Sequence, residues 1–141
     1  MLMGTYEHRL DSKARLVLPA KIREKLGDVV VVAAGLDKCV SLYSEREWEN
    51  FSEKIRDLAF YSNPKHRNFA RIMLSSADKT TIDGTGRVLL PTYLREHAKL
   101  SQEVVVCGVN DHAEVWDKEV WETIHKPGLE NLSELAQDLS F

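Results

Sequence analysis

The sequence lacks the features that mark several classes of protein. Its 141 residues include only two cysteines, Cys39 and Cys107, and neither has a second cysteine or histidine at metal-ligand spacing. We therefore expect no disulfide framework and no metal site. The longest apolar run, residues 29–36, is far shorter than the roughly 20 residues of a membrane span. The N-terminal residues MLMGTYEHRL lack the apolar core of a signal peptide. We expect a cytoplasmic protein with no membrane partner.

Motifs of catalysis are also missing. There is no GxGxxG sequence and no GKS or GKT phosphate-binding loop. The five histidines, at positions 8, 66, 97, 112 and 125, show no spacing that would place two of them on one helix face. Because no polar residues converge on a predicted cleft, we expect no enzyme, no cofactor and no small-molecule substrate.

An excess of positive charge is absent as well, since 19 Lys and Arg face 22 Asp and Glu, for a net charge of −3. This balance argues against a uniformly basic protein that coats nucleic acid. The charge is nevertheless unevenly distributed. Residues 1–27 have six basic and three acidic residues, 28–63 have four and seven, 64–99 have seven and three, and 100–141 have two and nine. Basic and acidic stretches therefore alternate along the chain.

The alternation reflects an internal repeat. The segment DSKARLVLPAKIRE, residues 11–24, aligns without gaps on DGTGRVLLPTYLRE, residues 83–96, with six of fourteen positions identical. After one inserted residue the match resumes, and it includes the Trp-Glu pairs at residues 48–49 and 121–122. The chain is thus read as two copies of one unit.

Each copy predicts a short strand, a helix that begins at a proline, a hairpin and a longer amphipathic helix. The predicted fold class is therefore α+β, built from tandem β-α-β-hairpin units. We expect the first unit at residues 1–62, with a core at about 5–47, a linker helix at 63–75, and the second unit at 76–141, with a core at about 76–119. A chain of this size buries roughly 68–70% of its unfolded surface, which suffices for a core.

The repeated loop is the candidate binding site. In Asp11-x-x-x-Arg15 and Asp83-x-x-x-Arg87, the aspartate is expected to close a tight turn by accepting backbone N–H bonds. Gly84 and Gly86 are expected to supply positive φ in the second loop. The arginine then projects from a rigid base, and its planar fork suits phosphate and the O6/N7 edge of guanine. An alternative remains open: a single such pair is usually a surface ion pair worth about 0.2–1 kcal/mol.

These residues carry a family resemblance. DSKARLVLP and DGTGRVLLP, followed by AGLDKCVSLYSEREWE and GVNDHAEVWDKEVWE and ending in LSELAQDLSF, closely resemble the MraZ family of the SpoVT-AbrB superfamily over essentially the whole chain. The resemblance implies that both AbrB-like units form one small intrachain pseudo-twofold β-barrel with peripheral helices. It also implies a sequence-specific transcriptional regulator of the division and cell wall gene cluster. Such a regulator binds repeated short boxes in double-stranded promoter DNA as a ring-like homo-oligomer in the nucleoid.

The family's Asp-x-x-Gly-Arg motif falls on Asp11 and Arg15 and on Asp83, Gly86 and Arg87, but Ala14 replaces the first glycine. If that position needs φ > 0, alanine costs on the order of 1 kcal/mol. We expect Arg15, Arg87, Lys13 and Arg9 to bind DNA, with the more basic first loop dominating base contact. We expect Asp11, Asp83, Gly84 and Gly86 to shape the loops. The alternative is an oligomeric protein-interaction module without specific DNA binding, in which Arg15 and Arg87 form interface ion pairs.

Overall fold

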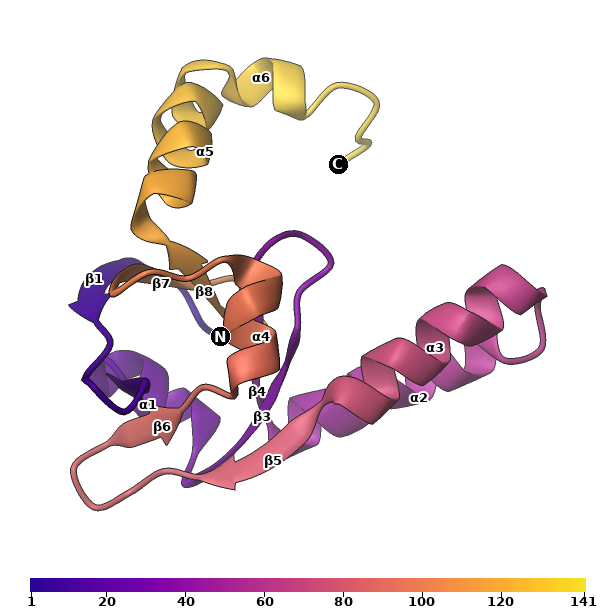
Figure 1. The fold of residues 1–141 in the computed structure, drawn as a ribbon. Helices are drawn as coiled ribbons and strands as arrows, with labels where there is room; N and C mark the ends of the chain where they lie inside the picture. The colour runs from indigo at the N-terminus through magenta and orange to yellow at the C-terminus, as the bar shows by residue number, and fades with distance from the viewer.

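The computed structural model describes residues 1–141. It confirms the α+β class, with antiparallel strands and surrounding helices (Figure 1). The first half contains β1 (Thr5–Arg9), β2 (Arg15–Val17), α1 (Ala20–Leu26), β3 (Val29–Ala34), β4 (Val40–Ser44) and α2 (Glu45–Ala59), and α3 (Pro64–Ser76) follows it. The second half contains β5 (Asp78–Thr81), β6 (Arg87–Leu89), α4 (Thr92–Ala98), β7 (Glu103–Gly108), β8 (Ala113–Asp117), α5 (Lys118–Glu130) and α6 (Leu132–Leu135).

The main sheet exchanges strands between the two halves. Its six strands follow the order β1-β7-β8-β4-β3-β5, so β1 pairs with β7 and β5 pairs with β3. The remaining strands, β2 and β6, form a separate two-stranded sheet. The six-stranded ladder is open, because its edge strands β1 and β5 do not pair with each other. The closed barrel therefore remains a prediction.

Both halves contribute to one hydrophobic core. Its cluster of 19 buried residues includes corresponding positions from the two copies. Examples are Leu16 with Val88 and Ile22 with Leu94. Burying a side chain of this kind stabilises the fold by about 1.5–3 kcal/mol. Because each half supplies part of the core and one edge strand of the other half's sheet, the halves fold around each other.

Helices α2 and α3 form an arm that extends away from the sheet (Figure 1). Ser44 Oγ accepts the Glu47 N–H at 3.2 Å at the start of α2, as the Ser-x-x-Glu sequence predicts. Asn63 Oδ1 accepts the His66 N–H at 2.9 Å at the start of α3. The helices pack through a small cluster of their own, formed by Ile55, Ala59, Ala70 and Met73.

The C-terminal segment leads away from the sheet on another side of the molecule (Figure 1). No residue of α5 or α6 is buried. Leucines at positions 132, 135 and 139 are all more than 60% exposed. None of the helices has the length and hydropathy needed to span a membrane.

Candidate nucleic-acid interface

The two predicted loops meet in the small sheet. Strands β2 and β6 are antiparallel, with Arg15 opposite Leu89, Leu16 opposite Val88 and Val17 opposite Arg87. Because the register is symmetric, each loop lies at one end of the pair. We call β2, β6 and the loops at residues 11–14 and 83–86 the loop ribbon. Leu16 and Val88 point into the core, so the alternate residues face outward.

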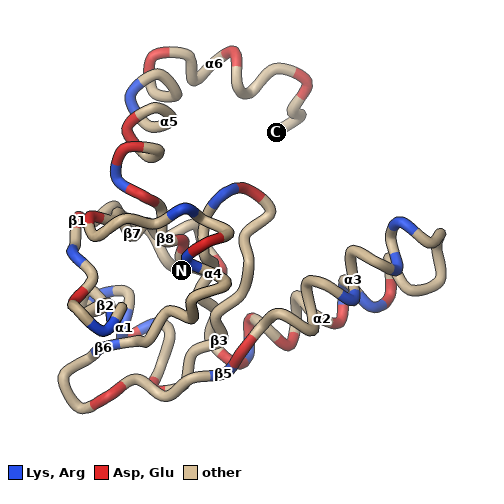
Figure 2. Tube along the Cα trace, in the orientation of Figure 1, with Lys and Arg blue, Asp and Glu red and all other residues tan.

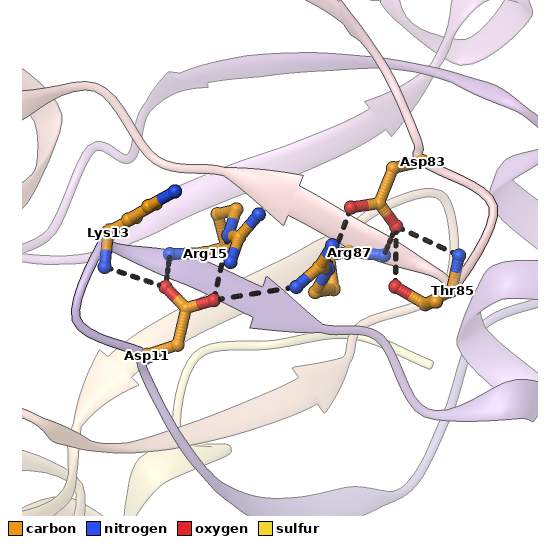
Figure 3. Close-up of polar contacts among 6 residues, drawn as sticks. All are labelled: Asp11, Lys13, Arg15, Asp83, Thr85 and Arg87. Carbon is orange, nitrogen blue, oxygen red and sulfur yellow. Dashed lines mark hydrogen bonds and ion pairs between the residues drawn. The ribbon is translucent and has the colours of Figure 1, made fainter.

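Asp11 organises the first loop through three hydrogen bonds (Figure 3). Its Oδ1 accepts the backbone N–H groups of Lys13 and Arg15, both at 2.9 Å. Its Oδ2 accepts Arg15 Nε at 2.7 Å. The short charge-assisted bond fixes the guanidinium, while the backbone bonds close the turn as an Asx turn. The predicted role of Asp11 in shaping the loop is therefore consistent with its contacts.

Asp83 makes the corresponding contacts in the second loop. Its Oδ1 accepts the N–H groups of Thr85 and Arg87 at 3.0 and 2.9 Å, and Arg87 Nε lies 2.7 Å from its Oδ2. Thr85 Oγ1 adds a hydroxyl bond at 2.9 Å, for which the first loop has no equivalent. The motif, in which three residues separate the aspartate from the arginine, thus produces the same geometry in both copies.

The guanidinium groups lie next to each other between the two carboxylates (Figure 3). Their side chains are about one-third exposed, 29% for Arg15 and 31% for Arg87. Arg87 Nη1 also lies 4.0 Å from Asp11 Oδ2, which couples the loops. The Nη1 and Nη2 groups of Arg15 make no hydrogen bond within the chain. These terminal donors are therefore available to a ligand at the surface.

The loop contacts lower the pKa of both aspartates. For Asp11 the main cause is the hydrogen bond from the Arg15 backbone N–H, which outweighs the opposing effect of desolvation. For Asp83 it is the corresponding bond from Arg87, and Thr85 adds to it. Hydrogen bonds that favour the ionised carboxylate act in this direction. Both aspartates are thus held in the charged form that the arginines require.

We expect acid to destabilise the loop ribbon. Unfolded aspartates titrate near about pH 4, and the folded-state pKa values lie lower. The stabilisation is therefore present above about pH 4 and is lost as the pH falls through the folded-state values. In urea unfolding between about pH 5 and pH 2.5, the midpoint should fall more for wild type than for the Asp11→Asn, Asp83→Asn double variant. The matched control is Asp57→Asn, at an exposed carboxylate, and parallel falls in all three proteins would contradict the prediction.

The backbone differs less between the loops than the sequence suggests. Ala14 has φ +59°, and the corresponding Gly86 has φ +82°. Their carbonyl groups accept the N–H groups of Leu90 and Leu18 across the ribbon, at 3.1 and 2.9 Å. Alanine therefore occupies a left-handed position in the first loop. Gly84 does not have a positive φ and has open space at its Cβ position, so the prediction of left-handed geometry was wrong for Gly84 and right for Gly86.

The substitution Ala14→Gly is expected to stabilise the protein. It removes about 1–2 kcal/mol of left-handed strain, and the greater flexibility of glycine in the unfolded chain offsets about 0.5–1 kcal/mol. Gly86→Ala should destabilise, because alanine is strained at φ +82°, and the terminal nitrogen of Arg23, which would lie 2.8 Å from the added Cβ, would have to move. Urea unfolding at neutral pH measures both changes in free energy. Shifts of the same sign would be inconsistent with this account.

The other predicted cations differ in their availability. Lys13 is exposed, and only its backbone N–H is bonded, to Asp11. Arg9, at the end of β1, donates to Glu103 Oε1 at 3.2 Å and to Gln102 Oε1 at 2.9 Å. Its charge is therefore partly compensated on β7, whereas that of Lys13 is not. In Figure 2, Lys and Arg recur around β2 and α1, while Asp and Glu recur along α5 and α6.

Two arginines that the repeat aligns make different contacts in the structure. Arg23 on α1 lies beside Gly86, and its side chain makes no hydrogen bond or ion pair. Its counterpart Arg95 on α4 donates to the Leu90 carbonyl and to Thr92 Oγ1, both at 3.0 Å. The exposed Val17 and Leu89 on the outward face were not predicted from the sequence. The signal for them was the strand register, which a single sequence does not provide.

No group of three or more His, Cys, Asp or Glu side chains is arranged to hold a metal ion. Both cysteines are buried and unpaired with each other. Burial raises the pKa of the Cys107 thiol to about 12. The chemistry that the site offers is thus that of anchored, partly exposed cations on a rigid ribbon.

Comparison with known proteins places the chain in a family. The model of the family described as MraZ protein matches the chain twice, over residues 1–72 and 73–139. "Transcriptional regulator MraZ" of Caldanaerobacter subterraneus subsp. tengcongensis is 44% identical over 139 residues, which cover 99% of this chain and 96% of that protein. The protein of the same name from Desulforamulus reducens is 40% identical, with 99% and 97% covered. The chain therefore belongs to the MraZ family.

Proposed function

We propose that this protein is a DNA-binding transcriptional regulator that contacts double-stranded DNA through the loop ribbon. The observation that carries the proposal is the pair of arginines on its outward face. Each is anchored to an aspartate through Nε at 2.7 Å, which leaves terminal guanidinium donors at the surface. The names of its relatives, which are transcriptional regulators, support the same role.

The shape of the loop ribbon supports contact with the major groove. This groove is about 12 Å wide in B-DNA and admits a two-stranded β-ribbon. An arginine held by a carboxylate loses little further side-chain entropy on binding, and its fork matches the O6 and N7 atoms of guanine. Arg15 and Arg87 are therefore proposed to read bases.

Neighbouring cations are proposed to contact the DNA backbone. Lys13 and Arg23 have no ion-pair partner, so binding phosphate costs them no internal contact. Arg9 must weaken its bonds to Glu103 and Gln102 to bind phosphate, and we assign it a smaller contribution. The chain as a whole has a net charge of −3, and the cations beside the loop ribbon supply a local positive potential that orients the approach to DNA.

The finer proposal concerns assembly and target. We propose that both halves form one small pseudo-twofold barrel-like body, and that several chains form a ring. One loop ribbon presents only four outward side chains from its strands, which is little for high specificity. Tethered copies raise one another's effective concentration, so a ring suits repeated short boxes in promoter DNA. With the family resemblance, this supports regulation of the division and cell wall gene cluster by a cytoplasmic, nucleoid-associated protein.

A second candidate function is an oligomeric protein-interaction module without specific DNA binding. It is favoured by the exposed apolar residues of the C-terminal segment. Leu132, Leu135, Leu139 and Phe141 are between 62% and 104% exposed. In that case Arg15 and Arg87 would form ion pairs between chains.

Salt dependence of binding to labelled promoter DNA tests the proposed function. If an assembly neutralises six to ten phosphates, its affinity should fall by about 10³ to 10⁵ between about 50 and 200 mM salt, because bound counterions are released. Fluorescence anisotropy across this range measures the slope, with oligomeric state monitored at each salt concentration. A binding constant nearly indifferent to salt would exclude this mechanism and favour the interaction module.

A further inference from the structure

The outward face of the loop ribbon carries two aliphatic side chains that the chain leaves about half exposed. Val17 is 45% exposed and Leu89 is 52% exposed. Both belong to short strands whose middle residues, Leu16 and Val88, are fully buried. Neither exposed side chain belongs to a hydrophobic cluster. The same type of exposure therefore occurs at corresponding positions of the two copies.

The strand register places each of these aliphatic residues opposite an arginine. Leu89 faces Arg15, and Val17 faces Arg87. Side chains directly opposite in an antiparallel pair have Cβ atoms about 4.5–5.5 Å apart. The four outward residues thus form a two-by-two pattern in which arginine and aliphatic residues alternate both along and across the strands.

This pattern favours DNA over protein as the occupant of the face. A protein that covered Val17 and Leu89 would also cover two guanidinium groups whose own aspartates already use Nε. Burying charged groups without new partners is costly. The major groove, in contrast, presents guanine acceptors and the thymine C5-methyl group on neighbouring base pairs. One surface can therefore satisfy the arginines and the aliphatic side chains together.

We propose that Val17 and Leu89 contact thymine C5-methyl groups beside the guanines read by Arg87 and Arg15. This inference rests on the proposed function, because it assumes that the loop ribbon enters the major groove. It assigns base discrimination to two uncharged residues. The two arginines supply specificity for guanine, and the two aliphatic residues supply specificity for thymine over uracil and cytosine at adjacent positions.

Replacing thymine by uracil tests this proposal without changing the protein. Duplexes enriched by wild type from a random 20-bp pool (on the order of two helical turns) are resynthesised with deoxyuridine at single thymine positions. Each contacted methyl group should contribute about fourfold to affinity, as expected for burial of one methyl-sized group. We expect such a loss at thymines adjacent to the guanines that the bound protein protects from methylation. Thymines elsewhere in the duplex should show no loss.

Polar variants without a side-chain methyl group then assign the effect to residues. Val17→Ser and Leu89→Asn should each abolish the preference for thymine over uracil at the position that the replaced side chain contacts, with the salt slope unchanged. The matched controls Val109→Ser and Leu36→Asn alter exposed aliphatic residues elsewhere and should keep the wild-type preference. Circular dichroism and sedimentation verify fold and oligomeric state.

The outcomes separate this proposal from the one on which it rests. If wild type binds thymine and uracil duplexes equally while Arg15→Ala loses binding, the methyl contacts are refuted and the DNA-binding function stands. If no duplex is enriched and binding is indifferent to salt, both proposals fail. If Val17→Ser or Leu89→Asn disrupts the oligomer and leaves the thymine preference intact, the aliphatic residues form a protein interface and the inference is overturned.

Discussion

The double variant Arg15→Ala, Arg87→Ala is expected to lose sequence-specific binding to duplex DNA. A bidentate arginine–guanine contact contributes about 1–3 kcal/mol of discrimination, which is roughly 5- to 150-fold for each arginine. The effect should be larger than for Lys13 or Arg23, because phosphate contacts add affinity without selecting a sequence. Competition between an enriched duplex and a random duplex measures the loss.

A lysine substitution distinguishes the effect of charge from that of the planar guanidinium. Arg15→Lys keeps the charge but lacks the planar fork, so it should retain salt-dependent binding and lose discrimination. Arg56→Ala is the matched control, since Arg56 lies on α2 in an exposed pair with Asp57. The loops should persist in the alanine variants, because Asp11 and Asp83 still accept backbone N–H bonds. Equal discrimination by wild type and the double variant, at unchanged oligomeric state, would favour the interaction module.

Leu16→Ala is expected to cause the largest loss of stability among the single substitutions considered. Leu16 is fully buried in the shared core and lies opposite Val88 in the centre of the loop ribbon. Removing a buried leucine side chain costs about 2–5 kcal/mol, because apolar contacts are lost and a cavity remains. This is a large fraction of the roughly 5–15 kcal/mol that stabilises a typical domain. Urea unfolding at neutral pH measures the change.

The exposed Leu36 provides the matched control for this prediction. It is 74% exposed, so Leu36→Ala should change the free energy of unfolding by less than about 0.5 kcal/mol. Because Leu16 attaches the ribbon to the core, Leu16→Ala should also weaken DNA binding at urea concentrations below the unfolding midpoint. Similar stabilities for the two variants would argue that the ribbon is not anchored through Leu16.

Much of the local structure follows from short segments of sequence. The helix starts at Ser44 and Asn63 depend on side-chain contacts three residues away, and the buried strand at residues 29–34 follows from its continuous apolar run. The closure of each loop by its aspartate was predicted for the same reason. The error at Gly84 shows the limit, because glycine permits a positive φ without requiring one.

The pairing of the strands was harder to predict from the sequence. The exchange of β1 and β5 between the halves depends on contacts across most of the chain, and these are determined by how two apolar faces fill one core. Nor does the repeat distinguish Arg23 from Arg95. Their surroundings differ because Arg95 bonds to Leu90 and Thr92, whereas Arg23 lies beside Gly86.

The sequence by itself determined the duplication, the α+β class and the two Asp-x-x-x-Arg turns, since hydrogen bonds within five residues specify each turn. Only the tertiary structure decided that the turns meet, that Arg87 approaches Asp11, and that Val17 and Leu89 remain outside the core. The physical reason is the antiparallel pairing of β2 with β6. Its register buries Leu16 and Val88 together and thereby directs two arginines and two aliphatic residues to one surface.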